Sequence, residues 1–111
     1  ALVLLNDPTY VEASRALGAR ILKESEGSDD QRITWAWRQT LQREPTSEET
    51  QVLQSLLEQH RKKYRDDPAS ADALLTTGFA PIPDGVEKVE LAAWTHVARV
   101  MLNLHETITR H

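Results

Sequence analysis

Residues 87–109 read EKVELAAWTHVARVMLNLHETIT, and this stretch decides the fold. When it is wound as a helix, its apolar side chains form one broad arc, and Arg99, Asn103 and Glu106 supply the clearly polar face. A helix this apolar is normally surrounded by other helices. The stretch therefore predicts a long C-terminal helix at the centre of a helical bundle. The arc consists of Leu91, Trp94, Val97, Ala98, Met101, Leu102 and Ile108, and is widened by Val100 and Leu104.

The rest of the chain predicts helices that surround this central one. Capping-box patterns at Ser28-x-x-Gln31 and Thr46-x-x-Glu49 mark two helix starts. About 80 residues are expected to be helical, far above the usual one third, and no segment shows strand alternation. We therefore predict an all-α fold, a compact bundle of four longer helices and one short one. The surrounding segments are residues 8–25, 30–43 and 47–64, with the short helix at about 69–76.

The three longer surrounding segments carry stripes that predict which side chains enter the core. In the first, Tyr10, Ala13, Leu17 and Ile21 share a face, and several small residues, Gly18 among them, would permit close approach by another helix. The stripe of the second consists of Ile33, Ala36, Trp37, Thr40 and Leu41. The third has the cleanest stripe, formed by Val52, Leu53, Leu56, Leu57, His60 and Tyr64. The loop around Phe79 and Ile82 contains two prolines, so it is not helical, and we expect it to be pinned to the core.

Composition bounds the class of protein. The 111 residues allow one domain, and 40% apolar and 27% charged residues are ordinary for a globular fold. No apolar run is long enough to cross a membrane. The absence of cysteine excludes disulfides, thiol catalysis and Cys-ligated metal or haem. The net charge of −4 opposes binding to nucleic acid or anionic membranes through bulk electrostatics.

The first residues, ALVLL, predict that the chain is a domain excised from a longer protein, because they contain neither an initiating Met nor a signal peptide. Exposing four consecutive apolar side chains would cost solubility. We therefore expect residues 2–5 either to fold back onto the central helix or to bury themselves in a symmetric homodimer.

Catalysis and metal binding find little support in the residues. The sequence contains no G-x-S-x-G, phosphate-loop or H-E-x-x-H motif. His96 and His105 are nine residues apart on one helix and so lie on opposite sides, which is unsuitable for shared metal ligation. His105 falls near the middle of the apolar arc, so we expect it to be partly buried, and we expect His60 to lie at the edge of the core. No catalytic residue, metal ligand or cofactor is therefore predicted in this chain.

The sequence bears on two kinds of macromolecular partner, nucleic acid and protein. The segments joined through Arg43–Glu49 superficially resemble a helix-turn-helix, but its second helix would present Glu48 and Glu49 to DNA phosphates, which disfavours nucleic-acid binding. Trp35 lies opposite the core stripe of its helix, with Arg38 one turn further on, and these residue types are enriched in binding hot spots. The alternative is that Trp35 packs under a neighbouring helix or loop. The predicted partner contacts are Trp35, Arg38, Leu2 and Leu4.

Three blocks of sequence resemble a known family. They are LVLLNDPTYVEA at residues 2–13, REPTSEE at 43–49 and ELAAWTHVARVMLNL at 90–104. They are similar to blocks of a large planctomycete family of cytochrome-c-associated proteins, whose C-terminal domain is catalogued as a domain of unknown function. The last helix of that family usually continues D-E-F-I-x-R, so His105 and Thr107 depart from its pattern.

The resemblance implies the C-terminal piece of a longer exported protein that carries haem-binding domains elsewhere, and it supplies no catalytic residues. We expect a non-catalytic helical domain that packs against, or scaffolds, the upstream domains of its parent protein. The alternative is the helical part of an enzyme site that the upstream region completes.

Overall fold

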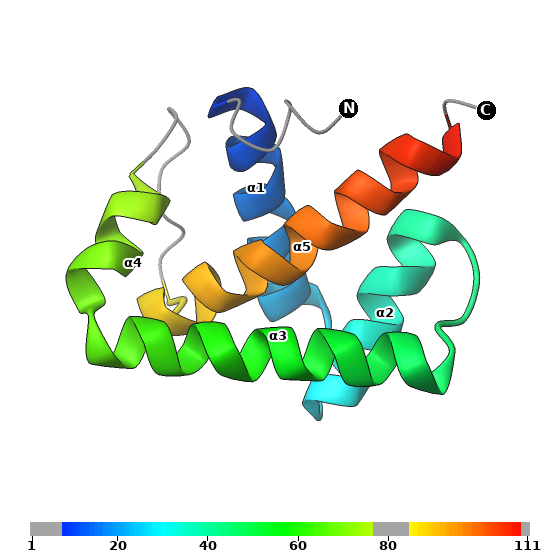
Figure 1. Ribbon diagram of the computed structural model, residues 1–111, viewed down its shortest axis with the longest axis horizontal. Coiled ribbons are helices and arrows are strands. Elements are labelled where there is room, and N and C mark those ends of the chain that lie inside the picture. The colour runs from blue at the N-terminus through cyan, green and yellow to red at the C-terminus, as the bar shows by residue number, and fades with distance from the viewer. Residues whose placement is uncertain (1–7, 77–84, 110–111) are drawn as a thin grey trace.

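The computed structural model describes residues 8–76 and 85–109, and the side chains of residues 11–76 and 85–105. Every regular element in this part of the chain is a helix, as predicted, and the predicted boundaries hold to within two residues. The bundle is shown in Figure 1. Its helices are α1 (Pro8–Glu24), α2 (Asp29–Leu41), α3 (Ser47–Asp66), the short α4 (Pro68–Leu75) and α5 (Lys88–Thr109).

The predicted capping boxes begin α2 and α3. The Ser28 hydroxyl accepts a hydrogen bond from the Gln31 backbone, and the Gln31 side chain accepts one from the Ser28 backbone. Thr46 and Glu49 make the same reciprocal pair at the start of α3. Both boxes satisfy amides that the first helical turn leaves without partners.

Helix α2 ends earlier than its sequence predicts, because Gln42 adopts a left-handed conformation with φ 59° and ψ 32°. Its amide still donates to the Arg38 carbonyl, which closes the last turn. Glycine normally occupies this kind of helix-ending position because it carries no Cβ. Pro45, three residues further on, indicates that the helix ends nearby, but nothing in the sequence marks Gln42 as the residue that ends it.

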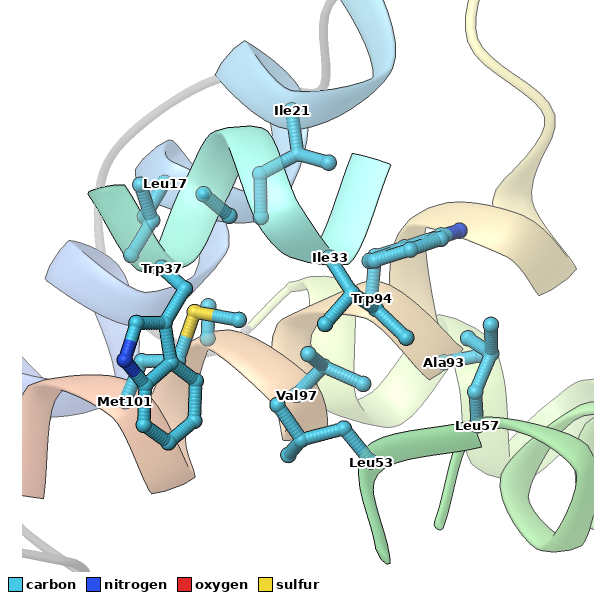
Figure 2. Packing of buried hydrophobic residues seen from close by; sticks show 12 residues of the cluster. Leu17, Ile21, Ile33, Trp37, Leu53, Leu57, Ala93, Trp94, Val97 and Met101 are labelled. Atoms are coloured by element: carbon cyan, nitrogen blue, oxygen red, sulfur yellow. The ribbon is translucent and has the colours of Figure 1, made fainter. Parts of the chain in front are cut away.

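The C-terminal helix is the centre of the bundle, as predicted: α5 contacts each of the other four helices (Figure 1). Trp94 and Met101 have no exposed surface. Figure 2 shows side chains from α1, α2, α3 and α5 converging on one cluster around Trp94, Val97 and Met101. This cluster is the main core.

Helix α1 crosses α5 closely, and it does so through a face slightly different from the predicted one. Gly18 lies against the backbone of Thr95 in α5, and Ser14 is fully buried. Leu17 and Ile21 are buried as predicted, but Ala13 is exposed, so its assignment to the core stripe was wrong. The glycine allows the two helix backbones to approach, which turns the face around Gly18 toward α5 and leaves Ala13 outside.

A second, smaller cluster joins α4 to the bundle. Tyr64 of α3 packs there with Leu75 of α4 and Leu91 of α5. Arg15 of α1 is 3% exposed and donates a hydrogen bond to the Leu75 carbonyl, at the C-terminal end of α4. A guanidinium at a helix C-terminus is favourable because the last carbonyls carry partial negative charge. Phe79 and Ile82, predicted to pin the neighbouring loop, lie outside the described residues.

Candidate functional site

The least expected arrangement in the molecule is a stack of rings between α3 and α5. The imidazoles of His60 and His96 lie face to face, with ring centroids 3.7 Å apart and an angle of 4° between their planes. Tyr64, one turn beyond His60 on α3, places its hydroxyl 2.6 Å from Nε2 of His96. His60 lies at the edge of the core, as predicted. Two helices distant in sequence are thus joined by three polar rings.

Burial and positive charge keep the two imidazoles neutral. The pKa of His96 is lowered to about 3. Burial of the imidazole is the largest cause, followed by His60 and then by the cations Arg99 and Lys63. Burial also lowers the pKa of His60, with contributions from Lys63 and Arg99. Burial raises the pKa of the Tyr64 phenol. With His96 neutral, the short contact is a hydrogen bond between the Tyr64 hydroxyl and Nε2, and the tautomer of His96 sets which of the two groups donates.

The geometry of the stack is unsuitable for joint metal ligation. The lone pairs of an imidazole lie in the plane of its ring, so two parallel stacked rings direct their lone pairs along parallel lines. Within residues 8–76 and 85–109, no group of three or more histidine, aspartate or glutamate side chains is arranged to hold a metal ion. The hydrogen-bond partner of His96 is a phenol, not the carboxylate or nucleophile that would accompany a catalytic histidine.

Sequence reasoning placed His60 correctly but missed its partner. His96 was weighed only against His105 on the same helix, whereas its partners lie on α3. One signal was present, because His60 and Tyr64 are four residues apart and therefore share a face of α3. Which residues of α5 this face would meet depends on how the two helices cross, and the sequence of neither helix states it.

Arg61, the residue after His60 on α3, connects three helices. Its guanidinium donates to Asp29 of α2 at 2.7 and 2.9 Å and to Glu90 of α5 at 2.7 and 2.8 Å. A further hydrogen bond of 2.7 Å reaches Glu58, so all five N–H groups are used. Arg61 lowers the pKa of Asp29. Arg61 opens the basic run Arg61, Lys62, Lys63 and Arg65, which as a charged helix end would be expected to be solvated, yet the Arg61 side chain is only 11% exposed.

An apolar groove lies between α3 and the C-terminal half of α5. We define the α3–α5 groove by four side chains, Val52 and Leu56 on α3 and Val100 and Leu104 on α5, which line three adjoining depressions. Val52 is 64% exposed and Leu104 is 36% exposed. The assignment of Val52 to the core stripe was therefore wrong. Figure 1 shows the reason, because α5 rises away from α3 towards its C-terminal end and no longer covers this part of it.

His105 lies on another side of the C-terminal end of α5, beside α1 and α2. We expected it to be partly buried in the apolar arc, but its side chain is exposed. It lines a shallow depression with Leu17, Thr40 and Leu102. The arc of α5 is continuous in sequence, but at this end it is covered by fewer helices than in the middle.

The predicted partner contacts fall into two groups. Trp35 and Arg38 line the same depression between α1 and α2. Trp35 is half-buried against the main core, with the Arg20 guanidinium carbon 5.8 Å from its ring centroid, and Arg38 forms an exposed ion pair with Glu44. Leu2 and Leu4 lie outside the described residues, as does the predicted burial of residues 2–5. The role of all four in binding stays a prediction.

The described residues form an all-α domain. Its polar residues, namely the stacked rings and Arg61, connect helices, and its exposed apolar side chains form a groove. None of the helices in the described ranges is both long and apolar enough to cross a membrane. A family model described as PSD1, a protein of unknown function (DUF1553), matches residues 1–57, which is just over half of the chain. The chain therefore belongs to this family. Comparisons with curated proteins and with solved structures gave no match.

Proposed function

We propose that this chain is a non-catalytic helical module of a longer, exported, cytochrome-c-associated protein. In this proposal the module binds the upstream part of that protein, and the α3–α5 groove is the binding surface. The resemblance of residues 2–13, 43–49 and 90–104 to planctomycete proteins of that kind supports the identity of the parent. The groove supports the mode of binding.

The observation that carries the proposal is the exposure of Val52. It is a β-branched residue of α3 and is 64% exposed, whereas the other large aliphatic side chains of the described residues, apart from Leu104, are buried or half-buried. Leu56, Val100 and Leu104 extend it into a contiguous apolar surface. Contiguous exposed apolar patches mark interaction sites more often than isolated apolar residues do.

Shape and charge indicate which part of the upstream region would fit. The groove runs between two diverging helices, so it accepts a rod-shaped element such as the apolar face of a third helix. Glu48 is exposed at its α3 end. We therefore expect an amphipathic helix from the upstream region, with apolar residues facing Val52 and Val100 and a lysine or arginine opposite Glu48.

Cysteine labelling tests this proposal, because the chain has no cysteine of its own. Val52→Cys is alkylated with a maleimide in the chain alone and in the presence of the purified upstream region. Gln39→Cys, exposed on α2, is the matched control. We expect the upstream region to slow alkylation at position 52 at least tenfold and to leave position 39 unchanged. A complex that leaves position 52 fully reactive, or no complex at all, would contradict the proposal.

A further inference from the structure

The ring stack lies at the narrow end of the α3–α5 groove. His60 follows Leu56 by one turn on α3, and His96 precedes Val100 by one turn on α5. Leu56, His96 and Val100 line one depression of about 320 Å³. The stack therefore marks the point from which the two helices diverge, and any change in its thickness would alter the groove beside it.

We propose that His60 and His96 form a proton-controlled latch that sets the width of the α3–α5 groove, closed when both rings are neutral and open when the pair takes up a proton. The inference rests on the proposed function in one respect, namely that the groove is the binding surface. The latch itself is a property of this chain alone.

The closed state is held by contacts that a proton would weaken. The parallel stack has a centroid separation of 3.7 Å, which leaves no room for water between the rings. Nδ1 of His60 is buried and has no hydrogen-bond partner. A neutral imidazole can carry its proton on the other nitrogen, but an imidazolium must carry N–H groups on both. A protonated His60 would therefore bury an unsatisfied donor unless its ring moved out to water.

The charges around the pair point in the same direction. Lys63 from α3 and Arg99 from α5 both act on the two imidazoles, and both are positive. Tyr64 is the other titratable group in contact, and it is neutral near pH 7. From α1, α2 and α4, no ionisable group of the described residues is among the charges acting on either ring. A proton on the pair would thus add a further positive charge to a positive, partly buried site.

The size of the effect follows from linkage. In the open state the rings would regain the ordinary histidine pKa near 6.5, whereas in the closed state the pKa of both is lowered. Each proton taken up on opening raises the open-to-closed ratio by up to tenfold for every pH unit below about 6.5. The groove is therefore expected to widen on acidification and to keep the width described above at neutral pH and beyond.

Distance measurements between spin labels test the latch without any partner. Labels are attached to the double variant Gln51→Cys, His105→Cys, which places one label on α3 and one on α5 at exposed positions. Between pH 7.5 and pH 4.5 we expect the distance distribution to move outward by on the order of 2 Å, as in helix shifts at other switches. In the same background, the double substitution His60→Phe, His96→Phe keeps two aromatic rings between α3 and α5 but neither ring can accept a proton, and the distances of this variant should not change with pH.

Two results would overturn the latch: distances that do not move with pH, or an equal movement in the variant that carries both phenylalanines. If that variant does not fold, histidine NMR of the wild-type chain decides, because one of the two stacked rings has to titrate where the distances change. Failure of the latch and failure of the proposed function are separate outcomes. The alkylation experiment at Val52 is done at constant neutral pH with the upstream region present, and the distance experiment is done without it.

Discussion

A Cβ added to Gly18 of α1 would lie 3.2 Å from the backbone nitrogen of Thr95 in α5 and 3.3 Å from its hydroxyl oxygen. The Thr95 hydroxyl donates a hydrogen bond of 2.6 Å to the Leu91 carbonyl one turn earlier in α5. The two helix backbones therefore approach with no side chain of α1 between them at this crossing. This contact fixes how α1 lies on the central helix.

Enlarging Gly18 should separate the two helices. We expect Gly18→Leu to lower the free energy of unfolding by about 1–3 kcal/mol, because the added side chain meets backbone atoms that cannot turn aside. Ala16→Leu, on the exposed face of the same helix, should change it by less than about 0.5 kcal/mol. Urea unfolding followed by circular dichroism measures both. Equal stabilities of the two variants would show that the crossing at Gly18 is not close.

Trp94 should be one of the most costly residues to truncate. It is fully buried at the centre of the main core, so Trp94→Ala removes a large aromatic contact and leaves a cavity (Figure 2). We expect a loss of about 3–5 kcal/mol. Trp35→Ala, at a half-buried position, is the control and should cost no more than about half as much. A melting temperature for Trp94→Ala within a degree or two of wild type would be inconsistent with its position.

Arg61 should contribute to stability in a way that an ordinary surface arginine does not. Arg61→Met keeps the aliphatic stem but leaves Asp29 and Glu90 without their shared partner, and we expect a loss of about 1–3 kcal/mol. Lysine should not restore it, because one ammonium cannot pair with two carboxylates in the forked geometry.

Arg38→Met is the matched control for Arg61, since that side chain is 62% exposed in its ion pair with Glu44. It should cost less than about 0.5 kcal/mol. Chemical denaturation of Arg61→Met, Arg61→Lys and Arg38→Met at low and high salt compares how much the two arginine sites contribute to stability. If Arg61→Met were no more costly than Arg38→Met, the network would be a surface feature only.

Gln42 should be a position where a single substitution stabilises the protein. Its left-handed φ of 59° is unfavourable for a residue with a Cβ and costs nothing for glycine. We expect Gln42→Gly to raise the free energy of unfolding by about 0.5–1 kcal/mol. Gln39→Gly, inside α2, should lower it by about 1 kcal/mol, and thermal melts of the two variants should therefore move in opposite directions.

The stability of the chain should fall on mild acidification because of the ring stack. The pKa of His96 is lowered to about 3 and that of His60 is also lowered, so the unfolded chain binds more protons than the folded one below pH 6.5. Their contribution is complete above pH 6.5 and is lost progressively as the pH falls toward 3. Allowing for the partial exposure of both rings, we expect a loss of about 1–2 kcal/mol between pH 7 and pH 5.

The carboxylates act in a different pH range. The pKa of Asp29 is lowered and that of Glu49 is about 2, so their contributions are lost only below their ordinary values near 4. Urea unfolding between pH 5 and pH 7.5 therefore isolates the histidines. Replacing both rings, as His60→Phe together with His96→Phe, should flatten this dependence. A stability that is independent of pH in this range would show that the rings are accessible to protons in the folded state.

The sequence by itself determined the helices. Ser28 and Thr46 begin α2 and α3 through contacts within four residues, and the apolar arc around Trp94 makes α5 the most buried helix. These features depend on hydrogen bonds and periodicities that are local in the chain, so a reading of neighbouring residues is sufficient to find them.

The tertiary structure decided which faces are covered. Val52 and His105 belong to apolar stripes in the sequence, yet both are exposed. Val52 lies where α3 and α5 diverge, and His105 lies beside α1 and α2 at the less covered end of α5. The stack of His60 on His96 and the fork of Arg61 onto Asp29 and Glu90 depend on the crossing angle and register of whole helices. These are set by packing of the complete core, including the close approach at Gly18, so no single segment encodes them.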